Sequence, residues 1–460
     1  MNSKENILII GAGLCGSLLA LRLAQRGYQV EVYESRPDLR TTDISAGRSI
    51  NLALSDRGLK ALRLAGVEEK AKAICIPMRG RLMHDTEGNT FESNYSGREG
   101  EYINSISRGD LNGILLTEAE KHENVNLHFN SKCLGVAIEN KKARFESYDT
   151  KEQFVIEADA IVGTDGAGSS LRKSYERQFS EFNVSQEFLT HGYKELEIPA
   201  KNGNHLISKD YLHIWPRGDY MLIALPNMDG SFTVTLFLSF SEGKYNFDNL
   251  TSKEKISTFF EEQFPDALAL IPDIMHEFEH NPTGKLGTVK CSPWAYQGNT
   301  LLMGDAAHAI VPFYGQGMNA SFEDVVVFDE VLNELEGNWE TVFSEFQKRR
   351  KQDADAIADL AIDNYYEMRD HVANPLFKEK RKIEMDLEKN FPTDYYSKYS
   401  LVTFNEHIGY HEAMTKGRAQ DKALLSMVKG NEVSTSMEMT KEELKVVLRK
   451  VQEETSKILK

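Results

Sequence analysis

A glycine-rich turn near the start of the chain constrains the fold more than any other feature. Gly11, Gly13 and Gly16 follow the short apolar run Ile7–Ile10 and open a segment with apolar residues at helical spacing. A strand, a G-x-G-x-x-G turn and a helix in this order form a dinucleotide-binding unit. The first glycine permits the tight turn, the second lets a pyrophosphate approach the backbone, and the third lets the helix pack on the strand. We therefore expect a Rossmann-like parallel sheet here.

An acidic residue completes this unit. Glu34 follows the next apolar run, Gln29–Tyr33, at the position where a carboxylate binds the ribose hydroxyls of adenosine. Because a carboxylate repels a 2′-phosphate, the site predicts FAD or NAD rather than NADP. The N-terminus of the helix adds free N–H groups and the positive end of a dipole for the phosphates. The residues expected to bind the nucleotide are Gly11, Gly13, Leu14, Gly16, Glu34 and Arg36.

The composition excludes several other classes of protein. At 460 residues the chain is too long for one small core. A net charge of −16 argues against nucleic acid and against an electrostatic membrane anchor, and no apolar run approaches the roughly 18 residues of a spanning helix. The four cysteines form no C-x-x-C pair, so we interpret them as reduced core thiols of a cytoplasmic protein and expect no metal site.

Two later segments decide between FAD and NAD. The first, GTDGAGSSLR at 163–172, follows a buried apolar run and opens a helix. The second, LLMGDAAH at 301–308, is followed by PFYGQGMN at 312–319. Together with the first turn, these segments resemble the three motifs of the class A flavoprotein aromatic hydroxylases, the p-hydroxybenzoate hydroxylase group, in order and separation. The resemblance implies non-covalent FAD and an α/β fold of the p-hydroxybenzoate hydroxylase type.

The chemistry of these segments agrees with a flavin. Asp305, at a strand end, can accept a hydrogen bond from a ribityl hydroxyl. The helix that begins near Gly315 can direct its N-terminus at the flavin pyrimidine edge, which becomes anionic on reduction. The flavin-binding residues expected here are Gly304, Asp305, Gly315, Gln316, Gly317, Met318 and Asn319.

Two more cofactor residues are assigned by the resemblance alone. It implies that Asp165 serves FAD and pyridine-nucleotide positioning, and that Arg108 lies near the flavin. From the residues themselves, Asp165 and Asp110 could instead cap helices. His308 has no acidic partner in the sequence pattern, and we interpret it as structural rather than catalytic.

The order of apolar runs predicts a Rossmann-like FAD-binding domain, a second sheet-based domain and a helical C-terminal region. We assign residues 1–75, 105–178 and 285–360 to a discontinuous FAD-binding domain. Alternating stretches such as 231–240 indicate a separate sheet, so 76–104 and 179–284 are assigned to a substrate-binding domain. Residues 361–460 are expected to be helical. They end in a charged amphipathic segment, Thr440–Lys460, which we interpret as a solvated surface helix.

Five segments narrow the resemblance to one family. They are GRSINLALS at 47–55, MRGRLMH at 78–84, HGYKEL at 191–196, LHIWP at 212–216 and PTGKL at 282–286. They resemble the kynurenine 3-monooxygenase family, in its soluble bacterial type, and are not shared by the wider hydroxylases. The resemblance implies hydroxylation of L-kynurenine to 3-hydroxykynurenine with NADPH and O2, through a flavin 4a-hydroperoxide, in tryptophan catabolism and NAD biosynthesis.

The same resemblance implies a substrate site. Arg81 corresponds to the arginine that pairs with the substrate carboxylate, a task that suits the planar guanidinium fork. Without the resemblance, we would interpret a single arginine in a loop as a solvated surface charge. We would likewise interpret a single asparagine or tyrosine in a helical region as a structural residue. The substrate-binding residues implied are Arg81, Tyr95, Asn364, Tyr399, Phe313 and Tyr314, the last with an open role.

No essential side-chain base is expected, because the amino group of kynurenine already donates electrons to the ring carbon beside it. The protein has to position the ring, exclude water and hold the flavin. A second G-x-G-x-x-G is missing from the sequence, so NADPH is expected to bind transiently at the surface. Two alternatives stay open: a class A hydroxylase of another aromatic acid, and a non-catalytic flavin-fold binding protein, which the late motifs argue against. The sequence also leaves open whether the enzyme is a homodimer.

Overall fold

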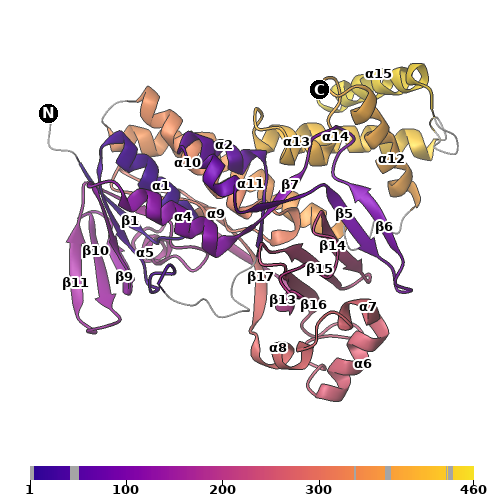
Figure 1. Ribbon diagram of the computed structural model, residues 1–460. Helices are drawn as coiled ribbons and strands as arrows, with labels where there is room; N and C mark the ends of the chain where they lie inside the picture. The colour runs from indigo at the N-terminus through magenta and orange to yellow at the C-terminus, as the bar shows by residue number, and fades with distance from the viewer. Residues whose placement is uncertain (1–4, 42–50, 336–337, 368–374, 431–432, 434–438) are drawn as a thin grey trace. The chain divides into compact units, whose positions relative to one another are not determined.

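The computed structural model describes residues 5–41, 51–335, 338–367, 375–430, 433 and 439–460. Residues 47–50, which belong to a segment quoted above, lie outside the described residues. The chain divides into two compact units (Figure 1). The first comprises Met1–Cys75, Ile106–Leu189 and Leu286–Ala358, and the second Ile76–Ser105, Thr190–Lys285 and Asp359–Lys460. The helical C-terminal residues, which the sequence analysis sets apart, group with the second unit.

The first unit is built on a six-stranded sheet in the order β18-β19-β12-β1-β2-β8. β1 pairs in parallel with β2 on one side and with β12 on the other, while the edge strand β18 runs antiparallel. The chain therefore reverses its direction of winding between β1 and β12, and the crevice outside the carboxyl ends at such a point binds ligands in α/β proteins. The strands are β1 Asn6–Ile10, β2 Gln29–Tyr33, β8 Val125–His128, β12 Ala160–Gly163, β18 Ala295–Tyr296 and β19 Thr300–Leu302.

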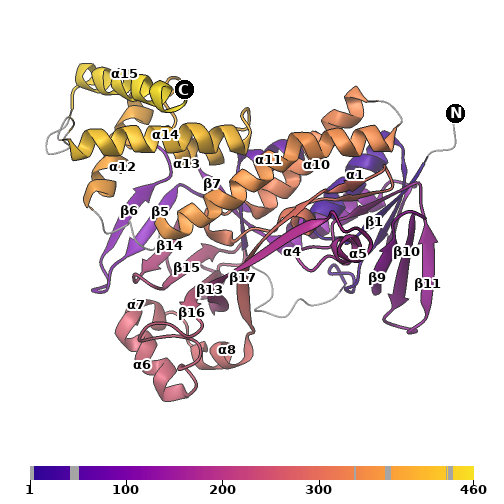
Figure 2. The ribbon, with the colours of Figure 1, turned by 180° about the vertical axis from the view of Figure 1, so that it is seen from behind.

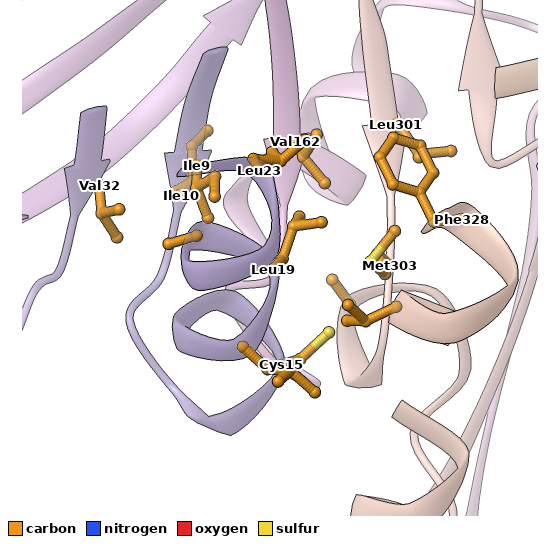
Figure 3. Close-up of a cluster of buried hydrophobic side chains, with 14 of the residues drawn as sticks. Ile9, Ile10, Cys15, Leu19, Leu23, Val32, Val162, Leu301, Met303 and Phe328 are labelled. Carbon is orange, nitrogen blue, oxygen red and sulfur yellow. The ribbon is translucent and has the colours of Figure 1, made fainter. Parts of the chain in front are cut away.

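Helices bury these strands, as their continuous apolar sequences predict. Gly13 is the residue before the first turn of α1 (Leu14–Arg26). Gly27, in the left-handed conformation, follows its last turn. It contacts α4 (Arg108–Glu120) and α10 (Gly317–Glu334). Figure 3 shows side chains of β1, α1, β12 and β19 gathered in this core, which also holds Phe328 of α10.

The first unit also contains a smaller antiparallel sheet of β9 (Ser131–Ala137), β10 (Lys142–Ser147) and β11 (Gln153–Glu157) (Figure 2). The remaining elements of the first unit are short and carry several site residues. They are β3 Asn51–Leu54, α2 Asp56–Leu64, α3 Glu68–Lys72, α5 Ser170–Gln178, α9 Asp305–His308 and the 3-10 helix η1 Pro312–Tyr314.

The second unit contains the sheet that the alternating sequence predicts, with β16 over the stretch 231–240. Its strand order is β17-β13-β16-β15-β14-β5-β6. The strands are β5 Gly80–His84, β6 Thr90–Asn94, β13 Asn183–Ile198, β14 Tyr211–Pro216, β15 Met221–Pro226, β16 Phe232–Ser239 and β17 Thr283–Ser292. The strands β4 Cys75–Met78 and β7 Ile103–Ser107 belong to a separate sheet. An aromatic-rich core includes residues of α6 Lys253–Gln263, α7 Pro265–Leu268 and α8 Ile274–His280.

Helices follow α11 (Trp339–Tyr366) to the end of the chain, as predicted. They are α12 Pro375–Asn390, α13 Lys398–Thr403, α14 Tyr410–Lys429 and α15 Lys441–Ile458. α15 is more than a solvated surface helix, because Leu444, Val447 and Val451 are buried in a core shared with α12 and α14 (Figures 1 and 2). None of the helices in the described part of the chain has the length and apolar character that crossing a membrane requires.

Candidate functional site

The first glycine turn has the geometry that a bound pyrophosphate needs. Gly11 has a φ of +100°, which side chains rarely adopt, so the turn requires glycine. A Cβ at Gly16 would lie 2.0 Å from the carbonyl oxygen of Gly11, so only glycine lets α1 start this close to β1. By contrast, a Cβ at Gly13 would meet no atom of a more distant residue within 4 Å in the described part of the chain. The open space at Gly13 fits a ligand against the backbone.

Glu34 is buried at the end of β2 and holds the same loop. One carboxylate oxygen accepts a hydrogen bond from the Ala12 N–H at 2.8 Å, and the other accepts from the N–H and Nε of Arg36, each at 2.9 Å. Burial acts to raise the pKa of Glu34, but these hydrogen bonds outweigh it and lower the pKa. Glu34 is therefore an ionised anchor of the turn. A carboxylate has further lone pairs, so its predicted bond to a ribose hydroxyl stays open to it.

The three glycine motifs lie at the carboxyl ends of three neighbouring parallel strands, β1, β12 and β19. The Thr164 hydroxyl donates to the carbonyl of Gly11 at 2.8 Å and so joins the first two motifs. Gly304, with a φ of +60°, packs so tightly on α1 that a Cβ would lie 3.0 Å from the Cys15 sulfur. All four cysteines are free, as predicted, and burial raises the pKa of the Cys15 thiol.

The third motif places an acid and a helix N-terminus together. Asp305 is the first residue of α9; burial raises its pKa, while Arg108 and His308 act in the opposite direction. Among the described residues no side chain caps the start of α10, so its first-turn N–H groups can receive a ligand. The side-chain amide of Asn319 is used within the protein: it donates to the carbonyl of Ala53 at 2.8 Å and accepts from the Ser55 N–H at 3.0 Å.

Asp165 has the capping role that the sequence analysis left open. Its carboxylate accepts hydrogen bonds from the Ser169 hydroxyl at 2.5 Å and from the Ser170 N–H at 2.6 Å, at the start of α5. Asp110 takes part in a cap through its backbone N–H, which donates to the Ser107 hydroxyl at 3.2 Å. The cofactor role of Asp165 stays a prediction.

His308 has an acidic partner, so the statement that it lacks one is wrong. Its Nε2 lies 2.6 Å from Oδ2 of Asp324, which also accepts the Gly304 N–H at 2.9 Å. The Nε of Arg350 donates to Oδ1 of Asp324 at 2.9 Å. The buried carboxylate of Asp324 thus binds Gly304, which precedes Asp305, and His308, which follows it.

This buried charge network extends further into the first unit. Glu323 accepts from Arg350 at 2.9 Å and from Arg57 at 2.7 Å, and both arginines are about 1% exposed. The burial of Asp324 acts to raise its pKa, but His308 and Arg350 outweigh it and lower the pKa. Sequence reasoning missed these residues. The available signal was the pair Glu323–Asp324 directly between Phe322 and the valines at 325–327, since acids are rarely buried unless paired.

Three of the predicted substrate residues form a cluster in the second unit. The guanidinium carbon of Arg81, on β5, lies 4.9 Å from the ring centroid of Tyr399 and 5.5 Å from that of Tyr95. The two rings stack with centroids 5.8 Å apart and planes 8° from parallel. The Tyr95 hydroxyl is buried and has no hydrogen-bond partner among the described residues, which fits a polar ligand at this position.

The other predicted substrate residues belong to different elements. Asn364 is buried near the end of α11, beside Tyr365, whose hydroxyl lies 3.0 Å from Nδ1 of His191. Phe313 and Tyr314 are buried in η1 of the first unit. Their contacts with a substrate stay predictions.

Comparison with known proteins defines the class first. The family described as FAD binding domain matches residues 4–360. Two solved structures share the fold at a TM-score of 0.64. The tetrameric form of 2-methyl-3-hydroxypyridine-5-carboxylic acid oxygenase is 19% identical and is matched over 84% of this chain and 96% of that one. PqsL of Pseudomonas aeruginosa, solved with 2-aminobenzoylacetate, is 16% identical and is matched over 80% and 97%. The chain is an FAD-dependent flavoprotein monooxygenase.

Closer relatives define the family. The kynurenine 3-monooxygenase of Myxococcus xanthus is 45% identical over 428 residues, which cover 93% of this chain and 91% of the relative. That of Flavobacterium psychrophilum is 44% identical over 448 residues, covering 97% and 99%. The chain belongs to the kynurenine 3-monooxygenase family. This membership sets aside the non-catalytic alternative.

Removing the Asp305 carboxylate is expected to weaken FAD retention. Asp305→Ala removes the carboxylate that is expected to accept a hydrogen bond from a ribityl hydroxyl, a loss of about 1–3 kcal/mol in a partly buried site. The dissociation constant of FAD, measured by refilling apoprotein and following flavin fluorescence, should rise accordingly. Asp110→Ala, the same change at an exposed acid of the same unit, is the control. Equal FAD affinity in the two variants would contradict the assignment of Asp305.

Proposed function

We propose that this enzyme hydroxylates L-kynurenine to 3-hydroxy-L-kynurenine with NADPH and O2, in tryptophan catabolism that leads to NAD, in the cytoplasm. The names of its relatives support this substrate. The observation in the structure that carries the proposal is the Arg81 cluster. A guanidinium beside two stacked tyrosines fits an amino acid with a carboxylate at one end and an aromatic group at the other.

Arg81 is proposed to bind the substrate carboxylate. Its five N–H donors match a carboxylate in a bidentate pair. The rings of Tyr95 and Tyr399 restrict the position of the guanidinium by cation–π contact, and the buried Tyr95 hydroxyl offers a further hydrogen bond. Binding energy gained at the carboxylate, away from the reacting carbon, holds the aniline ring in place for reaction.

The first unit is proposed to bind FAD through the strand-end motifs. FAD, once reduced by NADPH, supplies the activation of oxygen. The open turn at Gly13 would receive the pyrophosphate, and Asp305 a ribityl hydroxyl. The first-turn N–H groups of α10 would stabilise negative charge on the pyrimidine edge. We further propose that Phe313 and Tyr314 border the reacting ring and exclude water from it.

A proton-abstracting side chain is not required for this reaction. The ortho amino group of an aniline already enriches the neighbouring ring carbon, whereas a phenol gains from deprotonation by a base. NADPH is proposed to bind transiently, since the single dinucleotide fold unit is used by FAD. Substrate binding is proposed to accelerate the oxidation of NADPH, so that reducing power is not lost as peroxide.

The test is substrate-stimulated NADPH oxidation across a panel of aromatic acids. L-Kynurenine is expected to stimulate the FAD-loaded enzyme and to yield 3-hydroxykynurenine, identified by mass spectrometry. The panel includes 4-hydroxybenzoate and 2-aminobenzoylacetate, the second because it shares the ortho-aminoacyl ring but has a different acid chain. An enzyme that ignored kynurenine and hydroxylated a simple phenol would overturn the proposal.

A further inference from the structure

A buried glutamate of α12 binds two separate backbone segments. Glu388 is 0% exposed. Its Oε2 accepts hydrogen bonds from the Gly97 N–H at 2.9 Å and from the Ser96 hydroxyl at 3.2 Å. Its Oε1 accepts from the Ser397 N–H at 2.8 Å. All of these residues belong to the second unit. Oε2 binds the first segment and Oε1 the second, and Oε1 also accepts from the guanidinium of Arg98 in the first segment at 3.3 Å.

Each of the two segments carries a tyrosine of the Arg81 cluster. Tyr95 directly precedes Ser96. Tyr399 lies in the first turn of α13, and Ser397 is the capping residue of that helix. The stacked pair beside Arg81 is therefore connected through Glu388, although the two tyrosines are far apart in sequence.

Two arginines reinforce the connection. Arg381, also on α12, donates to the carbonyl of Tyr95 at 2.7 Å. Arg98 lies 3.3 Å from Oε1 of Glu388 and donates to the carbonyl of Pro392 at 3.0 Å. Burial acts to raise the pKa of Glu388, but the hydrogen bonds from Ser400 and the Gly97 N–H, with the charge of Arg381, outweigh it and lower the pKa. The carboxylate is ionised and both its oxygens act as acceptors.

The packing of the first segment on α12 is independent evidence of a tight fit. A Cβ at Gly97 would lie 2.1 Å from the carbonyl oxygen of Met385 on α12. Real contacts are never this short, so glycine is required for the segment to reach Glu388. The helix therefore acts as a rigid support for the segment that carries Tyr95.

We propose that Glu388 is a positioning residue for the substrate: it holds Tyr95 and Tyr399 in the stacked arrangement beside Arg81 and so sets the affinity for the substrate carboxylate. This inference rests on the proposed function, because it takes the Arg81 cluster as the carboxylate site. It gives α12 and the helices packed on it a role in specificity.

Glu388→Gln tests the inference with almost no change of shape. An amide has one oxygen acceptor and one NH2 donor. Whichever way it turns, its NH2 faces either the Ser96 and Gly97 donors or the Ser397 N–H, so one of the two connections is lost. The KM for L-kynurenine is expected to rise roughly 3- to 30-fold, with FAD content unchanged and kcat within about twofold of wild type.

A ligand without the carboxylate separates positioning from general damage. Kynurenamine, the decarboxylated analogue, retains the ring, the ketone and an amine. Its dissociation constant, measured by the change in flavin absorbance, is expected to be equal in wild type and Glu388→Gln. Asp386→Asn, the same chemical change on the same helix, is the control and should leave both ligands unaffected.

A milder variant covers the case in which Glu388→Gln does not fold. Ser96→Ala removes the hydroxyl that donates to Glu388 and accepts from the Arg98 N–H at 3.0 Å. It is expected to raise the KM for kynurenine about two- to fivefold, again without effect on kynurenamine. An unchanged KM for kynurenine in the folded variants, or an equal loss for both ligands, would overturn the inference. A wild-type enzyme that does not respond to kynurenine would overturn the proposed function itself.

Discussion

Arg81→Ala is expected to raise the KM for L-kynurenine roughly thirty- to a thousandfold, the largest kinetic effect of any single substitution considered. The substitution removes the proposed charge-assisted bidentate pair with the substrate carboxylate, which costs on the order of 2–4 kcal/mol in a desolvated site. The rate can fall as well, because binding at the carboxylate orients the ring. Steady-state kinetics at saturating NADPH and oxygen measure both effects, and FAD content should not change.

Two further variants make this result specific. Arg81→Lys should restore the affinity only in part, because an ammonium lacks the planar fork and cannot stack on the rings of Tyr95 and Tyr399 as a guanidinium does. Arg79→Ala removes an exposed arginine two positions earlier and should leave the kinetics unchanged. Unaltered kynurenine kinetics in Arg81→Ala would show that the carboxylate binds elsewhere.

Asp324→Asn is expected to have the largest effect on stability. Removing one partner of a buried ion pair leaves the other charge uncompensated and costs about 3–5 kcal/mol. Asp324 has two cationic or hydrogen-bonding partners, His308 and Arg350, and also holds the Gly304 N–H. The thermal midpoint of FAD release, followed by flavin fluorescence, should fall by on the order of 10 °C. FAD affinity should fall too, because Asp305 loses its support.

The pH dependence of this stabilisation has a definite sign. The pKa of Asp324 is lowered in the folded protein, because His308 and Arg350 outweigh its burial. A group with a lowered folded pKa contributes its full stability above its unfolded value, about pH 4, and loses it as the pH falls through the folded value. The difference between Asp324→Asn and wild type should therefore be constant at neutral pH and shrink only in acid.

An exposed acid of the same helix provides the control. Glu330 lies 3.9 Å from Lys60, and both side chains are well exposed, so Glu330→Gln should cost less than about 1 kcal/mol. A midpoint for Asp324→Asn equal to that of the control would show that the network does not support the flavin motif.

Local sequence was enough to predict the first unit's nucleotide site. The turn Gly11–Gly16 requires glycine for reasons of backbone geometry, and the flanking strand and helix follow from the spacing of apolar residues. The late motif around Gly304 was found through its resemblance to the class A hydroxylases, and the positive φ of Gly304 gives the physical reason for glycine there. The sequence also showed that α15 is amphipathic. It did not show that the apolar face of α15 packs into a core with α12 and α14.

Only the tertiary structure decided which buried side chains support the site. His308 binds Asp324, which lies sixteen residues later in the chain. Glu388 binds the N–H of Gly97, which lies far earlier in the chain. Asn319, expected at the cofactor, proves to use its side-chain amide on a backbone segment far earlier in the chain. A glycine turn is restricted by its own φ and ψ and can be read from the local sequence. The partner of a buried charge is set by the packing of distant elements, which no local pattern records.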